Sequence, residues 1–264
     1  MYTPFDRRGA IDHPGLRRLV TYLIDAGADG LAMTGNASES AWLDTGERYQ
    51  LAEWAAEAVN GRVPLIAGTN APNTADAIGF ARHAISCGAQ TVFCGAPAAG
   101  PSRGPDPIRH FRDLADAISV PLMLQNSPSA PIRLDELLDA AQHPNIRYVK
   151  EESLHAGHLL SALRERAPDL DVYTGGKNPI EDVARGARGG IPGSVGVADL
   201  VACHAAARAG DFPEARRRHL HVAPLLSAIR ANPLSWAKEI LCRLGVIEHA
   251  GTRSPNARPL DDAD

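Results

Sequence analysis

The sequence predicts a closed (β/α)8 barrel followed by a C-terminal helical extension. One pattern recurs along the chain: an amphipathic helix, a Gly-Ala or similar glycine-containing turn, and a short apolar run. It is seen in DAGADGLAM (Asp25–Met33), SCGAQTVFC (Ser86–Cys94) and ARGARGGIPG (Ala184–Gly193). Glycine just past a helix end adopts the left-handed conformation at little cost, and an apolar run directly after it is typical of a buried parallel strand. The length of 264 residues suits one such barrel.

The helices can be placed from their caps and their apolar spacing. Asp12 can cap the first helix, and its apolar residues then share one face: Leu16, Leu19, Val20, Leu23 and Ile24. A second helix is expected after Asp44, with Glu47 in a capping-box position. Further helices are expected over Thr74–Ser86, Pro107–Ala117, Leu134–Ala141, His155–Arg166 and Pro179–Arg185.

The apolar runs between these helices predict strands. They cover Gly30–Met33, Pro64–Gly68, Thr91–Cys94, Pro121–Gln125, Arg147–Lys150, Asp171–Thr174 and Gly190–Ile191. With Met1–Thr3 as a truncated first strand the count reaches eight, which favours a closed barrel over an open sheet.

The pattern changes after Gly196, where helices are expected over Asp199–Ala209, Phe212–Ile229 and Pro233–Leu244 without a further strand. We therefore expect the barrel over residues 1–196 and a helical extension packed on it over residues 197–264.

Composition excludes several function classes. Hydrophobic residues make up 44% and charged residues 22% of the chain, and the net charge is −4, so neither nucleic acid nor a membrane is an expected partner. The four cysteines form no CxxC pair and the ten histidines form no HExxH motif, so we expect no metal site and no cofactor. A cytoplasmic location is the expectation, because no apolar stretch of about 18 residues occurs.

Lys150 is the first candidate catalytic residue. It ends the apolar run Ile146–Lys150, and active sites of such barrels lie at the C-terminal ends of the strands. Burial favours the neutral form of an amine, and a neutral amine can attack a ketone to form an imine. The alternative from position alone is a solvated lysine at a strand end.

Six segments follow one another along the chain: MYTPFD, GNASES, LIAGTNAPNTADAI, VPLMLQNSPSAP, NIRYVKEES and NPLSWAKEILCRLG. This ordered set resembles the dihydrodipicolinate synthase / N-acetylneuraminate lyase family. The resemblance implies a class I aldolase or lyase that holds pyruvate or a related 2-oxo acid on Lys150. It further implies that Gly35, Asn36, Ala37 and Ser38 bind the substrate carboxylate, that Asn126, Gly193 and Ser194 contact substrate, and that the protein is a homodimer or homotetramer.

Departures from the family pattern separate this chain from the lysine-biosynthetic synthase. Gln125 stands where the family has a tyrosine that relays protons, which makes it the second candidate catalytic residue, but an amide does not titrate near neutral pH. Ala98 and Ala99 stand where the synthase has a tyrosine pair, and Ala130 stands where it has a carboxylate-binding arginine. We therefore expect a 2-oxo acid lyase of altered specificity rather than the genuine synthase.

The missing base leaves alternatives open. Ser194, Ser127, Tyr173, a water held by Gln125, or the carboxylate of the substrate could replace the tyrosine. Lys177 and Asn178 could meet an anionic substrate group, or lie in a solvated loop. The competing hypothesis is a non-catalytic family member that binds a small metabolite, which the lost tyrosines favour and the retained Lys150 opposes.

Overall fold

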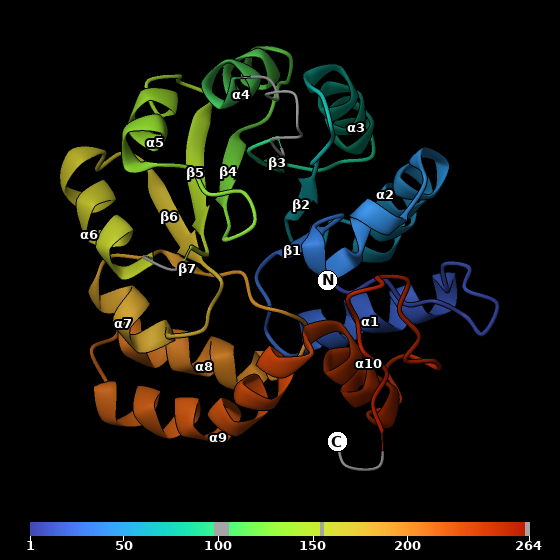
Figure 1. Cartoon of the computed structure of the whole chain (residues 1–264). Coiled ribbons are helices and arrows are strands. Elements are labelled where there is room, and N and C mark those ends of the chain that lie inside the picture. Colours follow the sequence, from blue (N-terminus) through green and yellow to red (C-terminus); the bar gives the residue numbers. More distant parts are fainter. Residues whose placement is uncertain (98–105, 154–155, 262–264) are drawn as a thin grey trace.

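Seven parallel strands lie side by side in chain order and curl into a barrel (Figure 1). This is a computed structural model, which describes residues 1–97, 106–153 and 156–261. The strands are β1 (Leu31–Met33), β2 (Leu65–Gly68), β3 (Thr91–Gly95), β4 (Leu122–Asn126), β5 (Ile146–Glu151), β6 (Asp171–Thr174) and β7 (Gly189–Gly190). The order β1-β2-β3-β4-β5-β6-β7, with a helix after each strand, confirms the predicted (β/α)8 barrel.

The N-terminal segment lies where an eighth strand would close the barrel. Residues 1–3 are not part of the sheet, so the expected first strand is absent as a strand. Instead, the Met1 amino group donates to the carbonyl oxygen of Ala32 at 2.5 Å, and the Thr3 hydroxyl donates to the Ser38 carbonyl oxygen at 2.6 Å. On its other side, Tyr2 contacts Gly193, which follows β7. Side-chain and terminal groups, rather than a backbone ladder, bridge this seam.

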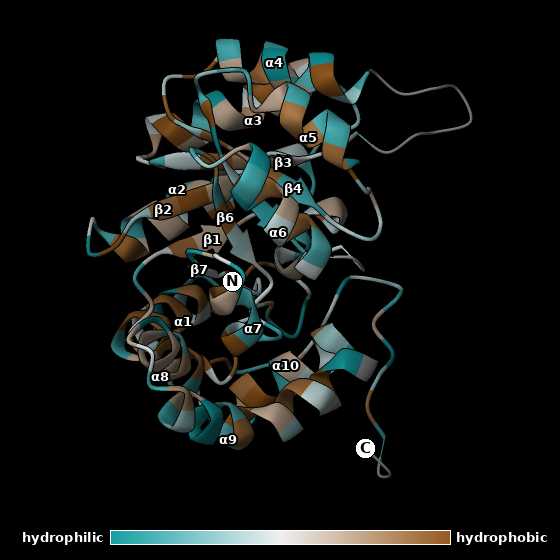
Figure 2. Cartoon of the chain, turned by 90° about the vertical axis from the view of Figure 1, so that its left-hand side faces the viewer, coloured by the Kyte–Doolittle hydropathy of each residue, from teal (hydrophilic) through white to brown (hydrophobic). Residues whose placement is uncertain are grey.

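Helices cover the outside of the sheet. They are α1 (His13–Asp25), α2 (Thr45–Val59), α3 (Thr74–Ser86), α4 (Pro107–Asp116), α5 (Leu134–Ala140), α6 (Ala156–Arg166) and α7 (Pro179–Ala184). The predicted caps are formed: Asp12 accepts the N–H of Gly15 at 3.0 Å, and Asp44 and Glu47 form a reciprocal capping box. Teal and brown segments alternate along these helices, as expected when one face of each packs on the sheet (Figure 2).

Three more helices follow β7. They are α8 (Val197–Arg208), α9 (Phe212–Ala231) and α10 (Pro233–Arg243), which confirms the predicted C-terminal helices. Helix α8 packs against both α7 and α9, and α10 packs against α9. Within the described ranges, no helix combines the length and apolar character needed to cross a membrane.

Candidate active site

The C-terminal end of β5 carries the candidate catalytic lysine. In the sheet register Lys150 lies between Gln125 of β4 and Tyr173 of β6. Its side chain is 13% exposed, and its Nζ lies 3.1 Å from Oε2 of Glu152. Because side chains alternate along a strand, Lys150 and Glu152 project to the same side of the sheet. The barrel thus holds an amine and a carboxylate in direct contact.

A series of side-chain hydrogen bonds joins this ion pair to β2 and β3. Nε2 of Gln125 donates to the same Oε2 of Glu152 at 3.0 Å, and Oε1 of Gln125 accepts from Nδ2 of Asn70 at 3.4 Å. Oδ1 of Asn70 accepts the backbone N–H of Gly95 at 2.7 Å. The two predicted catalytic residues, Lys150 and Gln125, are therefore brought together through Glu152.

Asn126 faces away from this group. Its Nδ2 donates to Oε2 of Glu151 at 2.6 Å, and its Oδ1 accepts the backbone N–H of Ile132 at 2.7 Å. Both Asn126 and Glu151 are fully buried, and burial raises the pKa of the Glu151 carboxyl. The structure does not bring Asn126 together with Lys150: its amide ties the loop after β4 to β5.

The predicted carboxylate-binding residues form one short turn after β1. Asn36–Ser38 is a 3-10 turn, and the hydroxyl of Ser38 accepts the N–H of Gly35 at 3.3 Å and donates to the carbonyl oxygen of Met1 at 2.7 Å. Gly35 is required here, because a Cβ would lie 2.8 Å from the ring of Phe93. Burial, and then the charge of Lys150, lowers the pKa of the Met1 amino group to about 5. The turn and Lys150 therefore both lie close to Met1, at the N-terminal segment.

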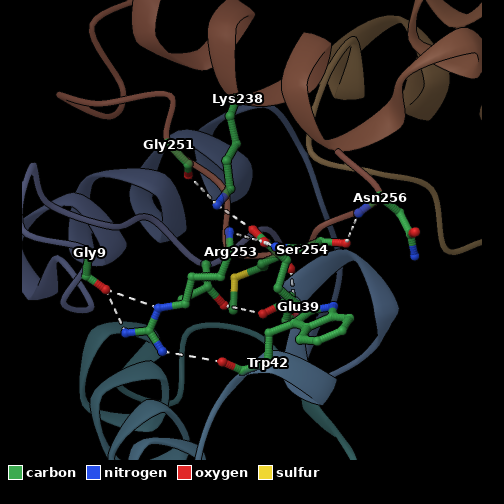
Figure 3. Close-up of polar contacts among 11 residues, drawn as sticks. Gly9, Glu39, Trp42, Lys238, Gly251, Arg253, Ser254 and Asn256 are labelled. Carbon is green, nitrogen blue, oxygen red and sulfur yellow. Dashed lines mark hydrogen bonds and ion pairs between the residues drawn. The ribbon is translucent and has the colours of Figure 1, made fainter. Parts of the chain in front are cut away.

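Glu39 ends this turn and is the centre of a buried ion pair (Figure 3). Its Oε1 accepts from Nζ of Lys238 at 2.5 Å, and neither side chain is exposed. Its Oε2 accepts the backbone N–H groups of Arg253 and Ser254 at 2.6 and 2.8 Å. Glu39 has a φ of 56°, a left-handed conformation that costs energy for a residue with a Cβ. The contacts to its carboxylate hold the turn in this strained form.

The side chain of Arg253 fastens the C-terminal tail, residues 251–258, to the start of the chain. Its guanidinium makes a bidentate ion pair with Glu47 at 2.7 Å, and it donates to the carbonyl oxygen of Gly9. It also lies 4.5 Å from the centre of the Phe5 ring. The tail and α10 together thus support the loop that follows β1.

The remaining predicted residues lie in loops at the ends of other strands or outside the described residues. Gly193 and the buried Ser194 follow β7 and lie beside the N-terminal segment. Lys177 and Asn178 are exposed in the turn before α7. Ala130 follows β4, and its backbone N–H donates to the Ser127 carbonyl oxygen at 3.1 Å. Ala98 and Ala99 lie outside the described residues.

Sequence reasoning does not single out Glu152, Asn70 or Lys238. The one available signal is spacing: Glu152 follows Lys150 by two residues and so must share its side of the strand. Lys238 and Glu39 are 199 residues apart, and no local pattern connects them. Among the described residues, no three His, Cys, Asp or Glu side chains are grouped as a metal site requires.

Comparison with known proteins identifies the family to which the barrel belongs. The model of the dihydrodipicolinate synthetase family matches residues 1–263. The chain belongs to this family. Members of the dihydrodipicolinate synthetase family are class I lyases, so both the resemblance and the expected enzyme class are confirmed.

Individual relatives extend the comparison. A 4-hydroxy-tetrahydrodipicolinate synthase from Methanospirillum hungatei is 31% identical over 274 residues, which cover 100% of this chain and 92% of that protein. The enzyme of that name from Bacillus velezensis is 35% identical over 178 residues, 66% of this chain and 62% of that protein. The crystal structure of YagE, a prophage protein of this family from E. coli K12, was determined in complex with pyruvate. It has a TM-score of 0.88 at 25% identity and covers 99% of this chain and 92% of that one.

Proposed function

We propose that this protein is a class I lyase that holds pyruvate or a related 2-oxo acid as an imine on Lys150. The observation that carries the proposal is the position of Lys150 inside the barrel, at the C-terminal end of β5, with its Nζ 3.1 Å from a carboxylate. The pyruvate complex of the E. coli family member supports a 2-oxo acid as the ligand. An imine at C2 withdraws electrons from the neighbouring C3–C4 bond, which permits aldol cleavage, aldol addition or dehydration.

A comparison of the lysines in the chain supports Lys150 as the imine-forming residue. The sequence contains three lysines: Lys150, Lys177 and Lys238. Lys238 is fully enclosed and paired with Glu39, so its amine is not accessible to a substrate. Lys177 is exposed in a turn and has no barrel wall around it. Lys150 alone of the three combines partial burial with a position inside the barrel.

The turn Gly35–Ser38 is the proposed site for the substrate carboxylate. Backbone N–H groups at the start of a short helical turn lack an intrahelical partner, which applies here to Asn36 and Ala37. The Ser38 hydroxyl, bonded to Gly35 and Met1, holds the turn in place. We assign Gly193 and Ser194 to the opposite wall, because they border the same N-terminal segment. For Asn126 the contacts favour a supporting role beneath the site, since both ends of its amide are occupied by protein groups.

Borohydride trapping tests the imine directly. Incubation with a panel of 2-oxo acids, followed by borohydride reduction and intact-mass measurement, is expected to add the mass of one substrate less one oxygen atom to the wild-type protein, because imine formation releases water and reduction adds two hydrogens. The Lys150→Ala variant is expected to gain none. The matched control is Lys177→Arg, which removes an exposed amine and should trap as well as wild type. An adduct of equal yield in Lys150→Ala would contradict the assignment.

We further propose that the native reaction is not that of genuine 4-hydroxy-tetrahydrodipicolinate synthase, although relatives carry that name. Gln125 offers no titrating hydroxyl, and Ala130 offers no guanidinium for the carboxylate of a second substrate. In a coupled assay with pyruvate and aspartate semialdehyde, we expect turnover far below about 1 s⁻¹, the low end of ordinary enzymes. Turnover at or above that value would show that this chain performs the synthase reaction with different residues.

A further inference from the structure

Lys150 forms an ion pair with Glu152. Because the family's tyrosine is absent from this chain, the group that transfers protons at the lysine has still to be assigned. We propose that Glu152 is the proton-transfer residue for imine formation on Lys150. This inference rests on the function proposed above. Oε2 of Glu152 lies 3.1 Å from the reacting Nζ, so the carboxylate contacts the atom at which protons must be lost.

The orientation of the Gln125 amide directs one donor at Glu152. The backbone N–H of Gly95 can only donate, so the atom of Asn70 that faces it is the oxygen Oδ1. The Asn70 amide nitrogen therefore faces Gln125 and meets its Oε1. That leaves Nε2 of Gln125 for Glu152, at 3.0 Å. One carboxylate oxygen is thus held between Gln125 and Lys150, which fixes its position relative to the amine.

The carboxylate also has room and access. The Glu152 side chain is 22% exposed, so a small substrate or a water molecule can reach it. It lies against Gly175 at the end of β6, where a Cβ would be 3.0 Å from Oε1 of Glu152. The absence of a side chain at Gly175 is what allows the carboxylate to lie beside Lys150.

Two of the other candidates contact neighbouring side chains instead. The hydroxyl of Ser127 contacts Ser129 at 3.1 Å. The ring of Tyr173 packs edge-on against Tyr148, with centroids 6.1 Å apart, and lies beside Gly189 of β7.

A single carboxylate is sufficient for the proton balance of imine formation. Glu152 accepts a proton from the Lys150 ammonium, and the neutral amine attacks the C2 carbonyl, forming the N–C bond. The carboxylic acid returns its proton to the new alkoxide, which gives the carbinolamine. The carboxylate then takes a second proton from nitrogen and delivers it to the departing hydroxyl as the C–O bond breaks. Ammonium and ketone become iminium and water, and Glu152 ends as a carboxylate.

The test measures the rate of adduct formation with pyruvate, by stopping aliquots with borohydride and reading intact mass across a range of pH. Glu152→Gln preserves size and is expected to form the same final adduct about 10²- to 10⁴-fold more slowly. Glu152→Asp retains a carboxylate and should therefore lose less of the rate than Glu152→Gln throughout that pH range. Exposed Glu165 provides the control, and Glu165→Gln should match the wild-type rate and profile.

Gly175→Ala tests the same idea without changing any charge. Its methyl group displaces the carboxylate, and a fall in trapping rate of about tenfold or more is expected even if Glu152→Gln fails to fold. Wild-type rates in both Glu152→Gln and Gly175→Ala, with Lys150 still labelled, would overturn the role of Glu152 and leave the imine lysine standing. A wild-type protein that forms no adduct with pyruvate or any other 2-oxo acid would instead overturn the proposed function, and this inference with it.

Discussion

The pair formed by Glu39 and Lys238 shows how single residues far from the chemistry can govern the site. Burial lowers the pKa of Lys238, and the charge of Glu39 opposes that shift. Removing two charges from water is costly unless they are paired and hydrogen-bonded. Here Lys238 also donates to the Gly251 carbonyl oxygen at 2.9 Å, while Glu39 accepts two backbone N–H groups. The charges therefore satisfy one another, and the loss of one would isolate the other.

Lys238→Met is expected to destabilise the protein by about 3–5 kcal/mol, because it leaves the Glu39 carboxylate buried without its cation. Urea unfolding followed by circular dichroism measures this. The double variant Lys238→Met/Glu39→Gln should recover part of the loss, since no unpaired charge remains. Lys177→Met, which removes an exposed lysine, should stay within about 0.5 kcal/mol of wild type. If the free energy of unfolding of Lys238→Met equals that of the control, the ion pair makes no net contribution to stability.

At the scale of elements, local signals predict helices and strands well. The caps at Asp12 and Asp44 form as expected, because capping depends only on residues three positions apart. Strand β5 extends one residue beyond each end of its predicted range, and β7 is shifted by one residue. These elements could be predicted because apolar spacing and glycine positions are visible in the sequence itself.

The loop after β1 could not be predicted in the same way. One of its strained residues, Glu39, is held by α10 and by the C-terminal tail, and these contacts join residues 199 to 215 positions apart. The direction of the Asn126 side chain was similarly hidden: the family motif places it directly after Gln125, and strand alternation directs these two side chains to opposite faces. The resemblance correctly located the loops, while the direction of each side chain required the structure.

At the scale of the whole molecule, the barrel is closed at one seam by side chains. Strand β7 has only two residues, and the N-terminal segment beside it makes no ladder. Tyr2 fills the space next to Gly193 and is 5% exposed. Burial raises the pKa of its hydroxyl to about 12, so it remains a neutral packing group near neutral pH. Sequence reasoning anticipated an incomplete first strand here, but not that a tyrosine would bridge the gap.

This closure predicts a specific coupling between Gly193 and Tyr2. A Cβ at Gly193 would lie 2.6 Å from the Tyr2 hydroxyl oxygen, closer than real Cβ contacts allow. Gly193→Ala should therefore destabilise the protein by about 1–3 kcal/mol, the usual cost of overpacking. Tyr2→Phe removes the clashing oxygen, and the next atom of the ring lies 3.3 Å away. In that background the same substitution should cost less than about 1 kcal/mol by urea unfolding.

A matched substitution separates this contact from a general effect of replacing glycine. At Gly79 in α3, the nearest atom to an added Cβ is the Tyr49 hydroxyl at 3.7 Å, an ordinary contact. Gly79→Ala should be neutral or stabilising by up to about 1 kcal/mol, because alanine favours the helix. If Gly193→Ala costs the same with Tyr2 as with Phe at that position, the two residues do not touch. The N-terminal segment would then have to be held by its contacts to β1 alone, and the seam beside β7 would be open.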